Sequence, residues 1–162
     1  MSGTHAGGRI DRRLAELGIV LPEPAKPVAA YVPTRLVGGL LYVSGQIPLS
    51  GGVALATGIV GEAVTLEQAK VCARQCVLNG LAAERAALAD RGGLDAVASV
   101  VKVGCFVAAG PTFTAHPQVA NGASELLVEV FGEAGRHARA AVGCPSLPLG
   151  VPVEVEFVFE VR

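Results

Sequence analysis

The stretch VPVEVEFVFEV, residues 151–161, alternates apolar and acidic side chains, and the expected fold is built around it. Successive side chains of a β-strand point to opposite faces of a sheet, so this pattern predicts a strand buried on one side. One face takes Val153, Val155, Phe157, Phe159 and Val161, and the other takes Glu154, Glu156, Val158 and Glu160. The simplest interpretation of the acidic face is the solvent-facing side of an edge strand. A functional site built on neighbouring glutamates is the alternative.

Two stretches upstream have the apolar spacing of amphipathic helices. The longer one, TLEQAKVCARQCVLNGLAAERAALA at residues 65–89, starts at Thr65, a good N-cap, and Gln68 completes a capping box. A second helix is predicted from residue 117 to residue 131. A short helical extension is predicted near the N-terminus, at residues 8–18, where glycine ends the pattern.

Glycine and proline between these helices indicate short strands that end in turns. Strands are predicted at residues 28–34, in GGLLYVSGQIPLSGG at 38–52, at 98–108, in GRHARAAVG at 135–143, and at 151–161. The order β-β-α-β-α-β-β contains no repeat or linker. It therefore predicts a single α+β domain over residues 1–162.

The composition indicates a globular chain that associates with itself. Hydrophobic residues make up 51% of the chain and charged residues only 17%, so we expect a homo-oligomer that covers some apolar surface. No run reaches the roughly 18 apolar residues of a membrane helix, and the N-terminal sequence lacks the apolar core of a signal peptide. We therefore expect a cytoplasmic protein with no membrane partner.

The four cysteines are expected to be reduced, structural thiols. Cys72 and Cys76 lie one helical turn apart, and Cys105 and Cys144 stand alone in apolar, strand-like contexts. No second ligand pair follows at a metal-binding spacing and the histidines are scattered, so no metal is expected.

The charge balance counts against a nucleic-acid partner. The formal net charge is −1, no block of basic residues occurs, and aromatic residues make up 4% of the chain. Proteins that bind nucleic acids usually carry a basic patch, and those that bind single strands add aromatic side chains that stack on bases. The composition therefore counts against RNA as a substrate.

Four segments carry a resemblance to a known family. YVSGQIP at 42–48, KVGCFVA at 102–108, HARAAV at 137–142 and LPLGVPVEVEFVFEV at 147–161 resemble motifs of the Rid family in order and spacing. This family comprises the reactive intermediate deaminases, also described as YjgF-type or L-PSP endoribonuclease-like proteins. The resemblance implies a chorismate-mutase-like fold, with a mixed sheet packed against two main helices. It also implies a homotrimer with a central barrel and clefts between its subunits.

Arg139 resembles the family's hallmark arginine, which holds the carboxylate of an imine or enamine acid. A planar, permanently charged guanidinium can grip a carboxylate through two hydrogen bonds. Taken without the resemblance, a surface ion pair is an equal alternative for Arg139. His137 stands where the family commonly has proline, and the effect of His137 and Arg136 on the cleft stays open.

The resemblance implies roles for five further residues. Glu154 resembles the glutamate that positions the attacking water, and Tyr31 resembles an aromatic wall of the cleft. Ser44 and Gly45 resemble a strand end near the ligand, and Asn121 an asparagine of the second helix. Tyr31 could instead be packed, Gly45 could serve a turn or bulge, and Asn121 could be an ordinary polar residue near a helix start.

The resemblance favours an enamine and imine deaminase that hydrolyses 2-imino acids to 2-oxo acids and ammonia without a cofactor. In this hypothesis Arg139 holds the carboxylate, while Glu154 and a backbone carbonyl place the water. The family's cysteine two positions after the arginine is Ala141 here, so no thiol chemistry is expected there. The alternative is a sensor or carrier that binds small carboxylates such as 2-oxo acids without catalysis. An endoribonuclease is a third, weaker hypothesis.

Overall fold

The computed structural model describes residues 7–26 and 30–162. Its main feature is a five-stranded sheet with the strand order β1-β2-β7-β5-β6. The bounds are Thr34–Val37 (β1), Leu40–Gln46 (β2), Val97–Ala108 (β5), Ala138–Cys144 (β6) and Val153–Val161 (β7). Neighbouring strands are antiparallel except β5 and β6, which are parallel. The predicted α+β class and mixed sheet are confirmed.

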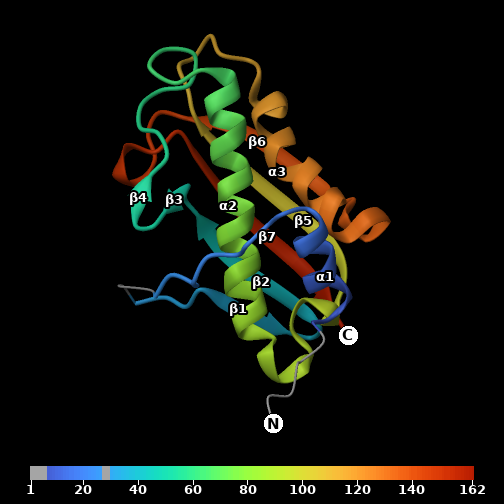
Figure 1. Cartoon of the computed structure of the whole chain (residues 1–162). Coiled ribbons are helices and arrows are strands. Elements are labelled where there is room, and N and C mark those ends of the chain that lie inside the picture. The colour runs from blue at the N-terminus through green and yellow to red at the C-terminus, as the bar shows by residue number, and fades with distance from the viewer. Residues whose placement is uncertain (1–6, 27–29) are drawn as a thin grey trace.

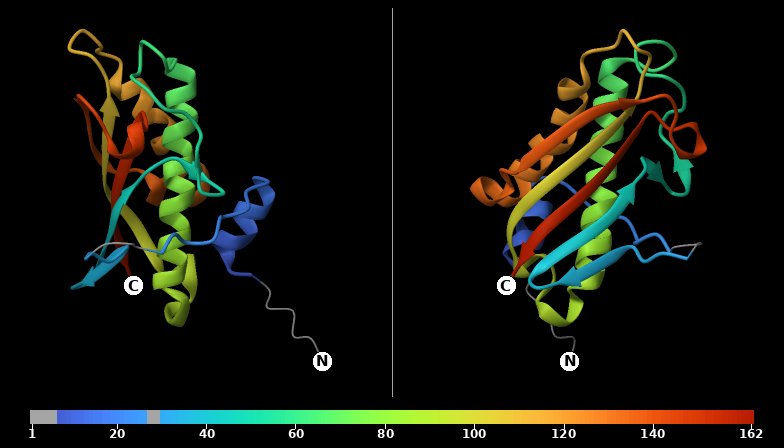
Figure 2. Two further views of the ribbon diagram at one scale, coloured as in Figure 1. Left: turned by 90° about the vertical axis from the view of Figure 1, so that its left-hand side faces the viewer. Right: turned by 180° about the vertical axis from the view of Figure 1, so that it is seen from behind.

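Two long helices, α2 (Leu66–Ala87) and α3 (His116–Phe131), cover one face of the sheet (Figure 1 and Figure 2). No helix of the described residues covers the other face, here called the open face. The side chains of β7 alternate between the two faces as predicted, and the valines and phenylalanines of one face are buried. However, β7 lies between β2 and β5, so the interpretation as an edge strand is wrong. An alternating pattern predicts that one face of a strand is buried, but it does not predict whether the strand has one neighbour in the sheet or two.

The first strand starts later than predicted. β1 begins at Thr34, so residues 30–33 lie outside it, and residues 28 and 29 of the predicted strand lie outside the described residues. Pro33 has no backbone N–H to donate to a neighbouring strand, which favours a start after this residue.

A small hairpin is added to the predicted order. β3 (Leu49–Ser50) and β4 (Val53–Ala54) pair antiparallel in a separate two-stranded sheet. Gly51 and Gly52 connect them with φ values of 59° and 81°. A two-residue hairpin turn needs such left-handed conformations, which glycine adopts at little cost.

The long helix α2 begins with the predicted capping box. Gln68 N donates to Thr65 Oγ1 at 3.1 Å, and Thr65 N donates to Gln68 Oε1 at 2.9 Å. Further along the helix, a Cβ on Gly80 would lie 2.7 Å from Cε2 of Phe157 in β7. This glycine therefore lets α2 pack close to the centre of the sheet.

The predicted N-terminal extension is helix α1 (Arg9–Glu16), and Gly18 follows its end with a φ of 68°. Asp95, far away in the sequence, caps its first turn. The Asp95 carboxylate accepts hydrogen bonds from Arg9 N at 2.7 Å and Ile10 N at 2.8 Å. Backbone N–H groups in the first turn of a helix have no partner within the helix, so this carboxylate anchors α1 to the domain.

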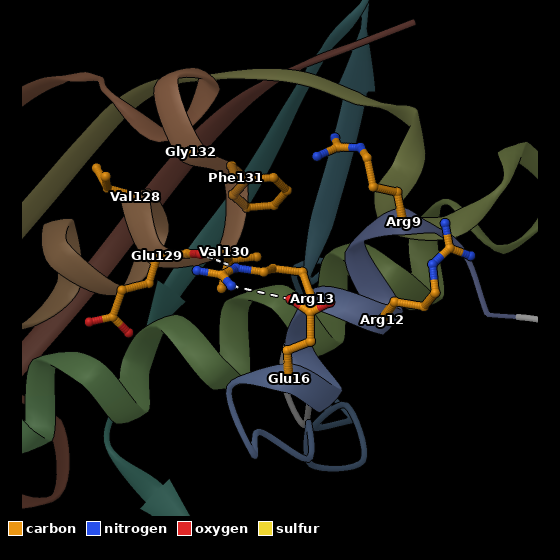
Figure 3. A pocket seen from close by; sticks show the side chains of 9 residues that line it. All are labelled: Arg9, Arg12, Arg13, Glu16, Val128, Glu129, Val130, Phe131 and Gly132. Carbon is orange, nitrogen blue, oxygen red and sulfur yellow. Dashed lines mark hydrogen bonds and ion pairs between the residues drawn. The ribbon is translucent and has the colours of Figure 1, made fainter.

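The other end of α1 contacts the last turn of α3. Arg13 Nε donates to the carbonyl oxygen of Glu129 at 2.9 Å, and Arg13 Nη1 lies 3.2 Å from Glu16 Oε2. Figure 3 shows these side chains around a pocket of about 330 Å³ between the two helices. A cation is stabilising near the carbonyl end of a helix, so Arg13 holds α1 against α3.

Candidate functional site

Arg139 lies on β6, at one edge of the sheet, and points to the side covered by the helices. It pairs with Val103 of β5, which is fully buried, and residues paired across strands share a face. Arg139 Nη1 donates to Asn121 Oδ1 at 2.9 Å and to Ser124 Oγ at 3.1 Å, both on α3. None of the ion pairs within residues 7–26 and 30–162 includes Arg139, which counts against the surface ion-pair interpretation.

His137 lies beside this group and is held at both ring nitrogens. Nδ1 lies 2.6 Å from the carbonyl oxygen of Gly135, and Nε2 lies 2.9 Å from Ser124 Oγ. Burial lowers the pKa of His137, the hydrogen bond to Gly135 partly opposes this, and the charge of Arg139 lowers it further. The imidazole is therefore neutral at physiological pH.

The cations of GRHARAAVG thus separate into surface and inward-facing residues. Arg136 is exposed and forms an ion pair with Glu133, with 3.0 Å between Nε and Oε2. His137 directly precedes β6 and Arg139 lies on it, and both side chains contact Ser124 of α3. Of the two arginines in this stretch, only Arg139 is turned toward the helices.

Glu154 lies on the open face, near the middle of the sheet. It pairs with Phe106 of β5, and a Cβ on Gly45 of β2 would overlap Glu154 Oε1. The register of β2 with β7 shifts around Gly45, so this glycine lies in a β-bulge and also makes room for the carboxylate. Burial raises the pKa of Glu154, and the negative charge of Glu156 raises it further.

Ser44 connects β2 to the segment that carries Tyr31. Ser44 Oγ donates to the carbonyl oxygen of Val32 at 2.7 Å, and Ser44 N donates to that of Pro33 at 2.9 Å. Tyr31 is 56% exposed, so it is not a packed core residue. Ser44 therefore has a structural role, and Tyr31 lies on the surface of the chain.

The structure divides the candidates into two groups. Arg139 and Asn121 meet on the helix-covered side, whereas Gly45 and Glu154 meet on the open face. The β5 partners of Arg139 and Glu154 are an odd number of positions apart, so these two side chains leave opposite faces of the sheet. A single chain therefore does not bring Arg139 and Glu154 into the same cleft.

Ser124 and His137 join the arginine group although the sequence motifs assign neither of them a role. Asn121 and Ser124 are three positions apart on α3, which places them on the same side of a helix. This spacing is a signal in the sequence, but many exposed polar pairs share it. Only the packing of α3 on β6 shows that this side faces Arg139.

The remaining groups with chemical potential are thiols. All four cysteines are free, as predicted, and Cys72, Cys76 and Cys105 are buried. Burial raises the pKa of Cys72 to about 11 and that of Cys105 to about 12, so both stay protonated. The part of the chain that the structure describes contains no group of three or more histidine, cysteine and acidic side chains that could hold a metal ion. In this same part, no helix is long and apolar enough to cross a membrane.

A mixed sheet with two helices on one face defines an α+β protein of the two-layer class. A family model described as "YjgF/chorismate mutase-like, putative endoribonuclease" matches residues 11–161. The chain belongs to this YjgF (Rid) family, as its motifs indicate.

Relatives resemble the chain over nearly its whole length. Protein TCP17 of Trypanosoma cruzi is 44% identical over 158 residues, which cover 97% of this chain and 97% of that protein. The solved structure of Atu1372 from Agrobacterium tumefaciens, a protein of unknown function, is 45% identical, with a TM-score of 0.85 and coverage of 94% of this chain and 91% of that one. A structure from Shewanella oneidensis named a putative endoribonuclease is 31% identical, with a TM-score of 0.87 and coverage of 95% and 100%.

Proposed function

We propose that the protein is an enamine and imine deaminase that hydrolyses 2-imino acids to 2-oxo acids and ammonia. Water adds to the carbon of the C=N bond and its proton passes to the nitrogen. The resulting carbinolamine expels ammonia as its hydroxyl becomes the 2-oxo carbonyl. The imine carbon is already electrophilic, so the protein needs to hold the carboxylate and place the water, and no cofactor is required.

The observation that carries the proposal is the setting of Arg139. Two neutral oxygens, from Asn121 and Ser124, hold its Nη1, and no carboxylate of the described residues neutralises its charge. A guanidinium held in this way keeps its full charge and further N–H donors for an anionic ligand. Arg139 also lies on an edge strand, so no sheet neighbour covers its outer side.

Glu154 is proposed to position the attacking water. Its raised pKa makes the carboxylate a stronger base than an ordinary surface glutamate. Because Glu154 and Arg139 leave opposite faces of the sheet, we propose that each cleft combines Arg139 of one copy with Glu154 of another. Ser44, Gly45 and Tyr31 would then belong to the Glu154 side of the cleft.

A homotrimer with a central barrel is proposed as the assembly that forms these clefts. The open face carries Tyr42 and Val142, which are 46% and 48% exposed, around the glutamates of β7. Packing the open faces of three copies around one axis would cover these side chains. A monomeric mass in native light scattering would contradict this assembly.

The activity can be tested with an imino acid generated in situ by an amino-acid oxidase and trapped with semicarbazide. The protein should lower the amount of trapped product, and Arg139→Ala should abolish this effect. Arg136→Ala is the matched control, because Arg136 is a nearby arginine that is exposed and paired with Glu133. Equal loss of trapped product with wild type and Arg139→Ala, or no loss with either, would show that the proposal is wrong.

Subunit complementation tests whether the cleft is shared. Arg139→Ala and Glu154→Gln are each expected to be inactive, and their mixture after dissociation and reassembly should regain activity. In randomly mixed trimers about a quarter of the clefts would combine an intact arginine with an intact glutamate from the next copy. No recovery would indicate that both residues act from the same protomer.

Binding of small carboxylates without catalysis is the second candidate. The observation that favours it is the separation of Arg139 from Glu154 within one protomer. Arg139 could then bind a carboxylate without Glu154 beside it to act as a base. Tight calorimetric binding of 2-oxobutyrate, together with no effect on imine trapping, would select this function.

Ribonuclease activity, which the family description names, has weaker support in this chain. The net charge of −1 and the scarcity of aromatic residues do not suit an RNA surface. RNA cleavage that Arg139→Ala abolishes would overturn this assessment.

We also propose a cytoplasmic location, because the four cysteines are free thiols.

A further inference from the structure

We propose that Ser124 and His137 are positioning residues that turn the Arg139 guanidinium so that its Nε–Nη2 edge receives the ligand carboxylate. The inference rests on the proposed carboxylate-binding role of Arg139. It adds which edge of the guanidinium binds and which side chains hold that edge in place.

The direction of each hydrogen bond in this group follows from its partners. The Gly135 carbonyl can only accept, so His137 Nδ1 carries the proton and donates across 2.6 Å. In the neutral imidazole, Nε2 must then accept, and the Ser124 hydroxyl donates to it across 2.9 Å. The lone pairs of Ser124 Oγ are thereby left to accept from Arg139 Nη1 at 3.1 Å.

These hydrogen bonds occupy both hydrogens of one guanidinium nitrogen, Nη1. Nη1 has two hydrogens, and Asn121 Oδ1 takes one while Ser124 Oγ takes the other. Neither Nε nor Nη2 of Arg139 forms a hydrogen bond with any residue in 7–26 or 30–162. Nε–H and one Nη2–H lie parallel in the plane of the group, and this pair matches the two oxygens of a carboxylate.

Backbone packing fixes the Gly135 carbonyl, the acceptor at the other end of this series of hydrogen bonds. Gly135 is buried, and a Cβ at this position would overlap the carbonyl oxygen of Leu127 in α3. The carbonyl that receives the His137 proton therefore belongs to a segment packed directly on α3. Because Asn121 and Ser124 also belong to α3, the imidazole and the guanidinium are oriented by the same helix.

Calorimetric binding of 2-oxobutyrate to the full-length protein separates positioning from general stability. Ser124→Ala and His137→Asn should each weaken binding by about three- to tenfold, because the acceptor at Nη1 is lost or disordered. His137→Gln should stay within about twofold of wild type, because its amide oxygen can reach the place of Nε2 and accept from Ser124. Combining Ser124→Ala with His137→Asn should cost no more than Ser124→Ala alone, since His137 acts through Ser124.

A second readout follows the guanidinium itself without a ligand. In ¹⁵N NMR of the arginine side chains, rotation about the Cζ–Nη1 bond of Arg139 should be slow in the wild type. Ser124→Ala should speed this rotation, whereas Arg136→Ala should not, because the Arg136 side chain is exposed and paired with Glu133. Equal rotation in wild type and Ser124→Ala would overturn the inference.

The outcomes also distinguish this inference from the proposed function. If Arg139→Ala binds 2-oxobutyrate as well as wild type, the carboxylate-binding role fails and this inference fails with it. If Arg139→Ala abolishes binding but Ser124→Ala and His137→Asn bind normally, only the positioning inference is wrong. Binding by His137→Gln that is as weak as that of His137→Asn would also contradict it, because the acceptor would then have no effect.

Discussion

Replacing Glu84 of α2 with leucine is expected to stabilise the protein and to remove a pH dependence of its stability. The Glu84 side chain is completely buried, and neither carboxyl oxygen has a hydrogen-bond partner among the described residues. It lies one helical turn after Gly80, which faces Phe157 of the sheet. Burial raises the pKa of Glu84 well above its ordinary value, so folding takes up a proton between the two values.

The sign of the pH effect follows from which state loses its proton first. Below the ordinary pKa of a glutamate both states are protonated, and the folded state pays only for burying a neutral carboxyl without partners, about 1–3 kcal/mol. As the pH rises, the unfolded state ionises first and becomes favoured. The free energy of unfolding then falls by about 1.4 kcal/mol per pH unit until the raised pKa is reached. Glu84→Leu should therefore be more stable by about 1–3 kcal/mol near pH 4, and the difference should widen above it.

Urea unfolding at a fixed protein concentration, followed by far-UV circular dichroism, measures both effects, and it suits a chain without tryptophan. Glu67→Gln on the same helix is the matched control, because the Glu67 side chain is 80% exposed. This control should change the free energy of unfolding by no more than about 0.5 kcal/mol at any pH. If wild type and Glu84→Leu show the same pH slope, Glu84 is not a protonated buried carboxyl. Lower stability of Glu84→Leu throughout would refute the reasoning about the unpartnered oxygens.

Three further outcomes follow from the contacts. Asp95→Ala should lower the thermal midpoint, at a cost of about 1–2 kcal/mol, because the first turn of α1 loses its acceptor, and an unchanged midpoint would contradict that anchor. Gly45→Ala should reduce imine hydrolysis in the semicarbazide assay because its Cβ displaces the Glu154 carboxylate, whereas full activity would contradict this close contact. If Glu154 is the base, the pH–rate profile should fall on the acidic side through its raised pKa, since only the ionised carboxylate accepts a proton, and Glu154→Gln should lack this limb.

Much of the fold could be predicted because its signals are local. The capping box at Thr65 and Gln68, the helical spacing that follows and the alternation of β7 each depend on residues close together in the chain. The start of β1 and the β3–β4 hairpin were harder to predict, because strands of four and two residues are too short to show a period.

The candidate site was predicted less completely than the fold. The meeting of Arg139 with Asn121, and of Gly45 with Glu154, agrees with the residues that the motifs single out. The motifs do not show that these two pairs lie on opposite faces of one sheet. That separation depends on the pairing of β5 with both β6 and β7, which joins residues distant in the sequence.

By itself, the sequence determined the class of fold, the family and the faces of its amphipathic elements, because periodicity and capping are properties of neighbouring residues. Tertiary structure alone decided that β7 is central, that Asp95 caps α1 and that Ser124 contacts both His137 and Arg139. It also decided the burial of Glu84 without a partner. Each of these depends on which distant segments pack together, and the free energy of that packing comes from the whole core rather than from any one stretch of the chain.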